Sequence, residues 1–582
     1  MVSLGWVLLL GAAPPLSGGA AFYSGLPASL SPAEVQAGVD AAIQAGAEVY
    51  HVPPSPTPYL FHNMSLAVEH AAHLSVVLGE NAFIFSVGAG VLVRDCINVS
   101  LVGGVVAYDP PPSAQGLLVT AKTTPGTYHG RPTPYTAGEV VLDARFPAPT
   151  AGAQCLLWGA GNVLSPGCWR CCLAVQCPPG SDGVASVASL GVNQGRQAGG
   201  TKVCIKTTGN FSVGTAVSWS NYRSGFTVTL VNCTRCNVRD TNIVAATFMA
   251  VTEFGGGGGN TYEGVRVGWH GGTSAPYTPL VWKGGQVLQP RLSSNADLFH
   301  SYGTRRGPAV KNCTFSNAAD DFFNVHNEIQ VAFSLNGGFL ELGGGGAVGP
   351  LYLVDPHSPV STDLNGNGAQ AGAPRTTYGT VSSLDYARAG DTLNLTTPWT
   401  FKHVATAKIR SIARTRDAGV LKAAAAVYAR VCKKQDCAKG PATFVYKVVL
   451  DAFVDKGSSA AATALLLADG VDATVVEQSA AGAVVENCTF MHTNANLGRW
   501  KSPNSKIVNN TFVNARMCNL EVTALQTYLE GTTYIPNVTI ADNLFVGFDN
   551  WCNASSIHPG SMANVKIFGN VFKPSAFSAI PP

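Results

Sequence analysis

A short phrase recurs along this chain: an apolar residue followed by Asn-Cys-Thr-Phe or a close variant. It occurs as AVKNCTF, AVVENCTF, KIVNNTF, TIADNLF and KIFGNVF, and VTLVNCT at 228–234 is a degraded copy. From Phe490 the repeated phenylalanines follow at steps of 22, 33 and 27 residues, at Phe512, Phe545 and Phe572. Steps of this length, rich in β-branched residues and without helical periodicity, predict an all-β fold in which each repeat is one coil of a parallel β-helix.

In a stack of coils, the number of residues between two positions in the sequence determines how far apart they lie in space. Equivalent residues of neighbouring coils would lie one above the other, with backbones about 4.8 Å apart. We therefore expect the cysteines in the repeat, Cys233, Cys313 and Cys488, to share one inward-facing slot as small buried hydrophobes.

The composition restricts the partners and the compartment. The chain has 582 residues, only 12% of them charged, and a net charge of +3, which gives no indication of nucleic-acid or polybasic membrane binding. Residues 1–20 contain a short apolar run followed by small residues, which predicts a secretion signal, with a buried strand as the alternative. No later apolar stretch is long enough to span a bilayer, so we expect a secreted or lumenal protein.

Sequons and cysteines fit an oxidising compartment. Of ten Asn-x-Ser/Thr sequons, those at Asn232, Asn312, Asn487 and Asn509 coincide with the repeat, where the asparagine should bond the backbone of the turn. The better glycan candidates are Asn63, Asn210, Asn394 and Asn553. Two groups of cysteines predict disulfides, the first with a zinc site as a rival: Cys155, Cys168, Cys171, Cys172, Cys177 and Cys204, and the pair Cys432 and Cys437.

The repeat is interrupted twice, which indicates two inserted β domains. Ser31 and Glu34 form a predicted capping box for a helix that would cover the N-terminal end of the coils. The predicted order is a signal (1–20), the cap and first coils (21–116), a Cys-rich insertion (117–225), coils with the candidate site (226–334), a second insertion (335–455) and C-terminal coils (456–582). An alanine-rich stretch in the second insertion, LKAAAAVYARV, favours a helix.

The segment 294–327 has the densest set of chemically active side chains. Asp297 and Asp320 are 23 residues apart, close to one coil, so we expect them to stack, with Asp321 as a third carboxylate. Beyond them the apolar Phe323 and Val325 alternate with polar residues at 324 and 326, which predicts that the apolar pair faces the core.

Counting nine residues on from each repeated phenylalanine extends this patch. The count reaches Asn324, Arg499 and Glu521, which would form a ladder on one outer face, although Arg499 and Glu521 could equally be a surface ion pair. Clustered carboxylates separate one another's pKa values, as acid/base catalysis of glycoside hydrolysis requires, and Asn, His and Arg nearby would bind sugar hydroxyls. The alternative is that the acids cap corners or bind calcium.

These residues resemble a known family. The order D-x-x-H, RGPAVKNCTF and DDFFNVH at 297–326 is similar to the core motif of family 110 glycoside hydrolases, the α-1,3-galactosidases, within the pectin-lyase-like superfamily of right-handed parallel β-helices. Further stretches fit in the same order: NVSLVGGVVAYDPPPSAQG, AATFMAVTEFGGGGGNTYEGVRV, and LGRWKSPNSKIVNNTFVNARMCNLEVT through YLEG.

The resemblance implies an inverting hydrolase that removes terminal α-linked galactose from an oligosaccharide or polysaccharide, without a cofactor or metal ion. It places Asp297, Asp320 and Asp321 at acidic catalytic positions. We expect the substrate to be bound by His300, Asn324, His326, Arg499, Glu521 and Glu530. The resemblance also calls for a further glutamate, for which Glu328, Glu341 and Glu530 are candidates. Inversion requires carboxyl groups about 6.5–9.5 Å apart, whereas directly stacked coils predict a shorter distance.

Two other functions remain open on the same fold. A polysaccharide lyase would need a basic residue, for which Arg499 or Lys501 could serve, beside an acidic sugar and calcium. A glycan-binding or cell-wall protein would bind without turnover. Three acids against few bases favour the hydrolase.

Overall fold

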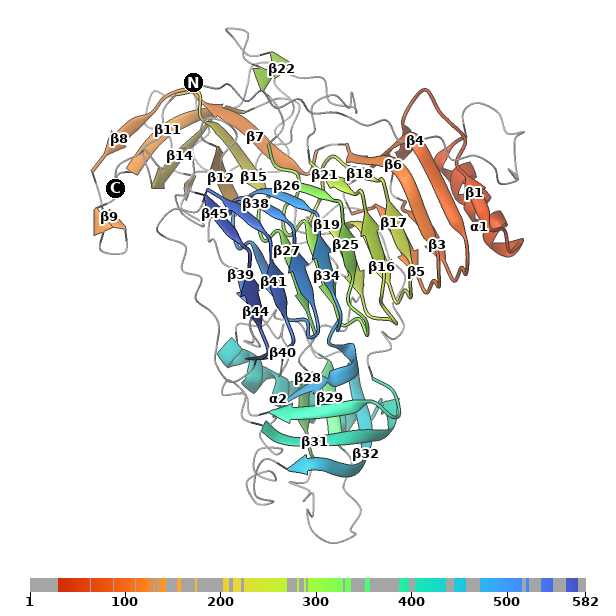
Figure 1. Ribbon diagram of the computed structural model, residues 1–582. Helices are drawn as coiled ribbons and strands as arrows, with labels where there is room; N and C mark the ends of the chain where they lie inside the picture. The colour runs from red at the N-terminus through yellow and green to blue at the C-terminus, as the bar shows by residue number, and fades with distance from the viewer. Residues whose placement is uncertain are drawn as a thin grey trace.

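The computed structural model shows a chain dominated by β-strands, many of them in parallel sheets (Figure 1). It describes residues 30–62, 64–86, 88–109, 111–125, 127–128, 131–132, 135–142, 154–158, 173–174, 202–208, 213–220, 225–268, 280–281, 287–288, 291–327, 330–335, 351–355, 387–396, 403–435, 444–456, 471–515, 520–522, 535–547 and 562–573. The predicted secretion signal lies outside these residues. No helix in this part of the chain is both long and apolar enough to cross a membrane.

Three rows of parallel strands make up the main body, and the chain visits them in turn. Row 1 consists of β1 (Val49–His51), β4 (Ser75–Phe85), β6 (Ser100–Tyr108), β17 (Asn237–Arg239), β20 (Thr261–Glu263), β25 (Ala309–Lys311), β34 (Val484–Glu486), β37 (Lys506–Val508), β41 (Thr539–Ala541) and β44 (Lys566–Phe568). Row 2 consists of β2 (Tyr59–Phe61), the second halves of β4 and β6, β18 (Asn242–Ile243), β21 (Arg266–Val267), β26 (Thr314–Ala318), β35 (Thr489–Thr493), β38 (Thr511–Ala515), β42 (Leu544–Val546) and β45 (Val571–Lys573).

Row 3 forms a separate parallel sheet and carries the candidate site. It consists of β3 (Leu66–Glu69), β5 (Val91–Arg94), β16 (Phe226–Val231), β19 (Met249–Phe254), β24 (Phe299–Tyr302), β27 (Phe323–His326), β36 (Gly498–Trp500) and β39 (Leu520–Val522). One apolar core is enclosed by the rows and contains residues from all three.

The repeated phenylalanines set the register of row 2, as predicted. Phe315, Phe490, Phe512, Phe545 and Phe572 are direct partners in successive strands. Their rings are stacked, with centroids 4.8–5.3 Å apart. The aromatic column therefore repeats at the spacing of the backbone hydrogen bonds.

The corner that precedes these phenylalanines has two asparagine positions with different roles. Asn487 and Asn509 have positive φ and lie on the outside, where the Asn509 amide donates to the Asn487 side chain and not, as predicted, to the turn backbone. The backbone bonds come from the next, inward-facing residue: Asn510 and Asn543 accept from the main-chain N–H groups of Cys488 and Asn510. The inner amide ladder thus supplies the buried hydrogen bonds that the turn needs.

The prediction of a common cysteine slot is only partly correct. Cys313 and Cys488 are buried, free and stacked, with the Cys313 N–H pointing at the Cys488 sulfur. Cys233 is also buried and free, but it follows β16 in row 3 and contacts the Val93 carbonyl of a different corner. The 228–234 copy of the phrase therefore belongs to another row. The side chains of the cysteines predicted to form disulfides lie outside the part of the chain that the structure describes.

An N-terminal helix and two insertions complete the fold. Helix α1 (Pro32–Gln44) begins at the predicted capping box of Ser31 and Glu34 and lies at the β1 end of the rows (Figure 1). The first insertion leaves between rows 2 and 3 and forms an antiparallel sheet of β7 (Ser113–Leu118), β8 (Lys122–Thr124), β11 (Tyr135–Leu142), β12 (Gln154–Trp158), β13 (Leu173–Ala174), β14 (Lys202–Thr208) and β15 (Ala216–Ser220). Short pairs β9 (Thr127–Tyr128) with β10 (Arg131–Pro132), β22 (Leu280–Val281) with β23 (Val287–Leu288), and β40 (Ile535–Pro536) with β43 (Met562–Ala563) lie outside the rows.

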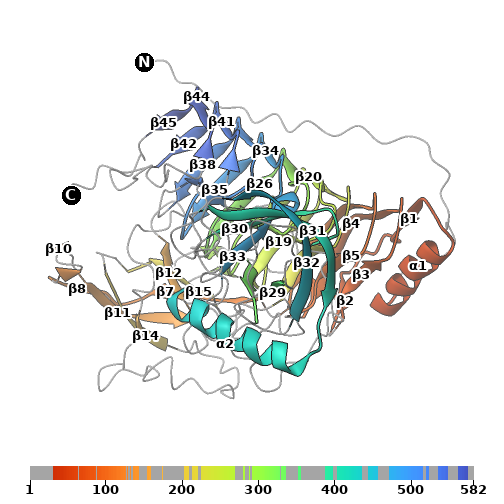
Figure 2. The ribbon, with the colours of Figure 1, turned by 90° about the horizontal axis from the view of Figure 1, so that it is seen from below.

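The second insertion is a closed barrel between rows 3 and 1. Its strands are β28 (Gln330–Phe333), β29 (Leu351–Asp355), β30 (Thr392–Thr396), β31 (His403–Arg414), β32 (Phe444–Lys456) and β33 (Val471–Val475). The barrel therefore extends beyond the predicted 335–455 segment at both ends. Helix α2 (Ala418–Gln435), at the alanine-rich stretch, packs against its outer side (Figure 2). The glycan candidate Asn394 lies half-buried on β30; Asn63, Asn210 and Asn553 are outside the described residues.

Row 2 contains a column of residues with positive φ, and one of them makes the stability of the fold depend on pH. Asn317, His492 and Asn514 are level in row 2 and all have positive φ. Burial lowers the pKa of His492 to about 4, and the Arg291 guanidinium adds to this effect. In the unfolded chain His492 binds a proton near pH 6.5, whereas in the folded chain it does so only near pH 4. The free energy of unfolding therefore decreases as the pH falls from about 6.5 to 4.

We expect His492→Asn to remove this acid sensitivity, because asparagine occupies the same conformation on either side of it. Between pH 7 and pH 4 the variant should lose less unfolding free energy than the parent by up to about 3 kcal/mol, measured by urea unfolding. His73→Asn, at an exposed position that also has positive φ, is the matched control and should leave the pH dependence unchanged. Identical pH curves for His492→Asn and the parent would contradict the assignment.

Candidate active site

Row 3 presents a ladder of polar side chains on the face opposite the core. Thr252, His300, Asn324, Arg499 and Glu521 are direct partners in five successive strands. The register of the last three is the one predicted from the repeat. Alternation along β27 explains the ladder, because Phe323 and Val325 belong to the core and leave the residues between and after them on the other face.

Three carboxylates gather where the chain enters β24 and β27. Asp297, Asp320 and Asp321 each have an oxygen within 4.8 Å of the other two. Paired residues of β24 and β27 are 24 positions apart, as the pairing of Phe299 with Phe323 shows, so Asp321 and not Asp320 is level with Asp297. The predicted convergence is thus confirmed, but the predicted stacking partner is wrong by one residue.

Burial differs among the three acids. Asp297 and Asp321 are 5% and 1% exposed, whereas Asp320 is half-buried. The Asp321 N–H donates to Asp297 Oδ1 at 3.1 Å, and the Asn496 N–H donates to Asp321 Oδ1 at 2.7 Å. Asp320 is held through its main chain, because its carbonyl accepts the Thr493 hydroxyl.

Arg499 supplies positive charge to this cluster. Its Nε lies 3.2 Å from Asp321 Oδ2 and 3.5 Å from Glu521 Oε2, and the Arg499 and Glu521 side chains are only 18% and 17% exposed. Arg499 and Glu521 are therefore not the surface pair that the sequence left open. Burial raises the pKa of Asp321 well above its usual range; Arg499 opposes this shift, while the charges of Asp320 and Asp297 add to it.

Two histidines adjoin the acids. His300 Nδ1 is 2.7 Å from Asp297 Oδ2, and His300 Nε2 is 3.0 Å from His326 Nε2. The His326 ring is stacked on Tyr302, with centroids 5.6 Å apart. The sequence motifs placed both histidines near the site, but their mutual contact follows from the outward direction of alternate residues on adjacent strands.

A buried glutamate beneath β24 was not predicted. Glu253 on β19 faces the core, where it accepts hydrogen bonds from Ser301, Asn260 and Tyr262 at 2.5, 3.0 and 2.9 Å. Burial raises its pKa, and the three donors counteract the rise. Because Ser301 lies between His300 and Tyr302, this network fixes β24 from the core side. A glutamate within the apolar strand MAVTEF was the available signal.

The two insertions flank opposite ends of the site. At the acid end, the Ser220 hydroxyl of the first insertion donates to the Asn295 carbonyl, and the Asn295 amide donates to the Pro112 carbonyl. Residues next to the acids pack on the same insertion in a cluster of Leu117, Leu156, Ala216, Leu292 and Ala319. At the histidine end, the Asn327 amide donates to the carbonyl of Val475 on the last barrel strand.

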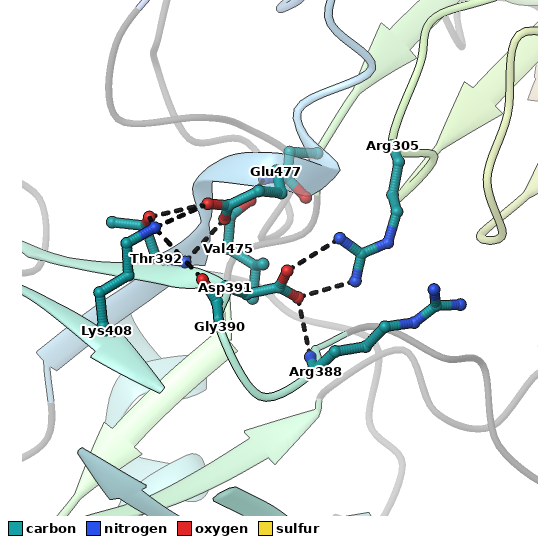
Figure 3. Close-up of polar contacts among 9 residues, drawn as sticks. Arg305, Arg388, Gly390, Asp391, Thr392, Lys408, Val475 and Glu477 are labelled. Atoms are coloured by element: carbon teal, nitrogen blue, oxygen red, sulfur yellow. Dashed lines mark hydrogen bonds and ion pairs between the residues drawn. The ribbon is translucent and has the colours of Figure 1, made fainter. Parts of the chain in front are cut away.

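A polar cluster ties the barrel to the segment after β24 (Figure 3). Arg305 makes two parallel hydrogen bonds, of 2.9 and 2.7 Å, to the Asp391 carboxylate, which also accepts the Arg388 N–H. Next to it, Glu477 accepts both the N–H and the hydroxyl of Thr392. The bidentate pair is mostly buried, so it holds the barrel in a defined position relative to β24.

The remaining predicted site residues, Glu328, Glu341 and Glu530, lie outside the described part of the chain. The sequence matches no model of a known protein family, and no curated protein shows significant similarity to it.

We expect Asp391→Asn to weaken the attachment of the barrel, because it leaves the Arg305 charge without its carboxylate in a mostly buried place. The loss of stability should be about 3 kcal/mol by urea unfolding, with faster proteolytic cleavage of the barrel. Asp451→Asn breaks an exposed ion pair with Arg410 in the same barrel and should cost less than about 1 kcal/mol. Equal effects of the two substitutions would contradict this role.

Proposed function

We propose that this chain is a secreted glycoside hydrolase built on a right-handed parallel β-helix, and that it removes a terminal α-linked galactose. The observation that supports hydrolysis is the cluster of Asp297, Asp320 and Asp321, whose oxygens lie within 4.8 Å and whose environments differ in burial. Such differences separate the protonation states of neighbouring carboxyl groups, which acid/base catalysis requires. The choice of galactose rests on the family resemblance of the 297–326 motif.

Asp320 is the best candidate for the general base. It is the least buried of the three acids, so its charged form keeps the most hydration. Asp321, with its raised pKa, is the one that more readily holds a proton. Arg499 is paired with Asp321 and opposes the rise in the pKa of that carboxyl, but burial outweighs it. Asp320 would accept a proton from the attacking water.

The short distances within the cluster support a role for all three acids on one side of the reaction. Inversion needs about 6.5–9.5 Å between the acid and the base, to leave room for sugar and water, and 4.8 Å is too close. The general acid would then be the further glutamate that the resemblance calls for, on the opposite side of the sugar. The Asn324, Arg499 and Glu521 ladder would bind sugar hydroxyls beside the base.

A calcium-dependent lyase is the second candidate, because three carboxylates within 4.8 Å could hold a cation. Against it, both oxygens of Asp297 and of Asp321 are already in contact with His300, Arg499 or a main-chain N–H group. A lyase would form an unsaturated product that absorbs ultraviolet light and would lose activity with a chelator, whereas the proposed hydrolase would do neither.

We expect Asp320→Asn to slow the release of galactose from 4-nitrophenyl α-galactoside and from galactosylated oligosaccharides by about 10²- to 10⁴-fold, the usual contribution of a general base. Because Asp320 is half-buried, the thermal transition should barely move. The variant should stay slow on a dinitrophenyl galactoside, whose leaving group needs no proton. Recovery on that substrate would instead identify Asp320 as the acid.

Asp542→Asn is a matched control, since this exposed aspartate occupies the corner slot where asparagine stands in other coils. It should leave turnover unchanged. Binding of galactosylated glycans by the parent protein without any turnover would contradict the proposal and favour a glycan-binding protein.

A further inference from the structure

Beside the acid cluster, three buried side chains form one continuous line of hydrogen bonds. Asp297 Oδ2 contacts His300 Nδ1 at 2.7 Å, His300 Nε2 contacts His326 Nε2 at 3.0 Å, and His326 Nδ1 contacts the Asn327 carbonyl at 2.8 Å. We refer to Asp297, His300 and His326 as the proton chain. None of the three is more than 5% exposed, so water does not substitute freely for these contacts.

The carbonyl end determines where the hydrogens lie. A carbonyl oxygen only accepts, so His326 Nδ1 must carry the hydrogen of that bond. In a neutral His326 ring, Nε2 is then the acceptor. It follows that His300 donates through its own Nε2.

The acid end requires one more proton. With His300 Nε2 protonated, the 2.7 Å contact between His300 Nδ1 and Asp297 is a hydrogen bond only if either the carboxyl or the ring carries an additional proton. Moving a proton from His300 on to His326 gives a third arrangement with the same total. Every arrangement that satisfies all three bonds therefore holds the same number of protons, one more than a carboxylate and two neutral imidazoles would hold.

We propose that Asp297, His300 and His326 act as a single titrating unit that holds one shared proton, and that this proton keeps the acid cluster in its working geometry. Losing the proton leaves two acceptors facing each other, either between Asp297 and His300 or between the two rings. Gaining another leaves two donors facing each other. This inference rests on the proposed function only for its effect on turnover; the proton count itself does not.

The charged and titratable neighbours favour a proton near the acid end. Asp320, the proposed ionised base, lies beside Asp297 and attracts positive charge toward His300. Lys501, fully buried, donates its main-chain N–H to the Val325 carbonyl and is therefore level with His326.

The arginine of the ladder and a tyrosine also lie close to the proton chain. Arg499 stands next to Asn324 in the ladder and is paired with Asp321 and Glu521. Tyr302 contacts both rings of the chain, His326 by stacking and His300 edge-on. The tyrosine thus packs against both rings.

The direct test is nitrogen NMR of the histidine rings across pH, in protein labelled with ¹⁵N-histidine. His300→Gln and His326→Gln assign the two signals. We expect a protonated Nδ1 and an unprotonated Nε2 in His326, and both rings changing at the same pH with the release of one proton. Two independent transitions near the ordinary value of about 6.5, or a His326 hydrogen on Nε2, would overturn the proposal.

Turnover gives a second measurement. His326→Phe keeps a ring beside Tyr302 but removes the acceptor for His300, so the shared proton should be lost more easily. The basic limb of the pH–rate profile should then move down by about one pH unit, the size expected for a hydrogen bond to a charged group. His326→Gln, which retains an acceptor oxygen, should move it less, and His51→Gln, at an exposed position on β1, should not move it. An unmoved limb in His326→Phe would contradict the role in turnover.

The two measurements separate the possible failures. If both rings change together with one proton but the protein hydrolyses no glycoside, the proton chain is supported and the proposed function is contradicted. If the protein hydrolyses glycosides but the two rings titrate independently, the proposed function is supported and the proton chain is contradicted.

Discussion

The structure depends on one constraint, the parallel hydrogen-bond register that places equivalent residues of neighbouring strands level with one another in each row. In a parallel ladder, neighbouring strands are about 4.8 Å apart, and a slip by a single residue would exchange the two faces of a strand. The same register produces the stacked rings from Phe315 to Phe572 on the core side and the ladder from Thr252 to Glu521 on the other. Core and site are therefore two faces of one arrangement.

The polar face of row 3 is unusual because its charges are buried. Removing a carboxylate from water is costly unless a partner or a proton compensates. Here Arg499 lies between Asp321 and Glu521, and His300 lies against Asp297, so each buried acid is accompanied by a cation or a donor. Beneath them, Glu253 is satisfied by three donors from the core side. Compensation of this kind fixes side chains that would otherwise have many rotamers.

The sequence carried enough information for the register but not for the local geometry. The repeated phenylalanine locates Asn324, Arg499 and Glu521 because the offset between the strands of rows 2 and 3 is the same at these three positions, and the capping box of Ser31 and Glu34 is a purely local signal. Asp320 was wrongly predicted to be level with Asp297 because the number of residues between neighbouring strands varies. A difference of one residue is enough to change the partner. Cys233 was misplaced because similar corner chemistry serves two different rows.

Other features were beyond sequence reasoning for a physical reason. The contact of His300 with His326, and that of Ser301 with Glu253, depend on side-chain directions across strands that belong to different coils. The ends of the insertions could not be located accurately from the sequence either, since strands of the barrel and strands of the three rows have the same residue preferences. Whether the chain is an enzyme is a separate question from its register and rests on the chemistry of the acids.

The barrel lies in the chain between β27 and β34, yet β27 pairs with β36 in the same parallel sheet as the other neighbouring strands of row 3. The barrel strands, which span residues 330–475, are thus accommodated at a turn without disturbing the strands on either side. A fold of this kind can gain, lose or exchange a whole domain at a corner while Asn324 and Arg499 stay neighbours. What surrounds the acids can therefore diversify independently of the acids themselves.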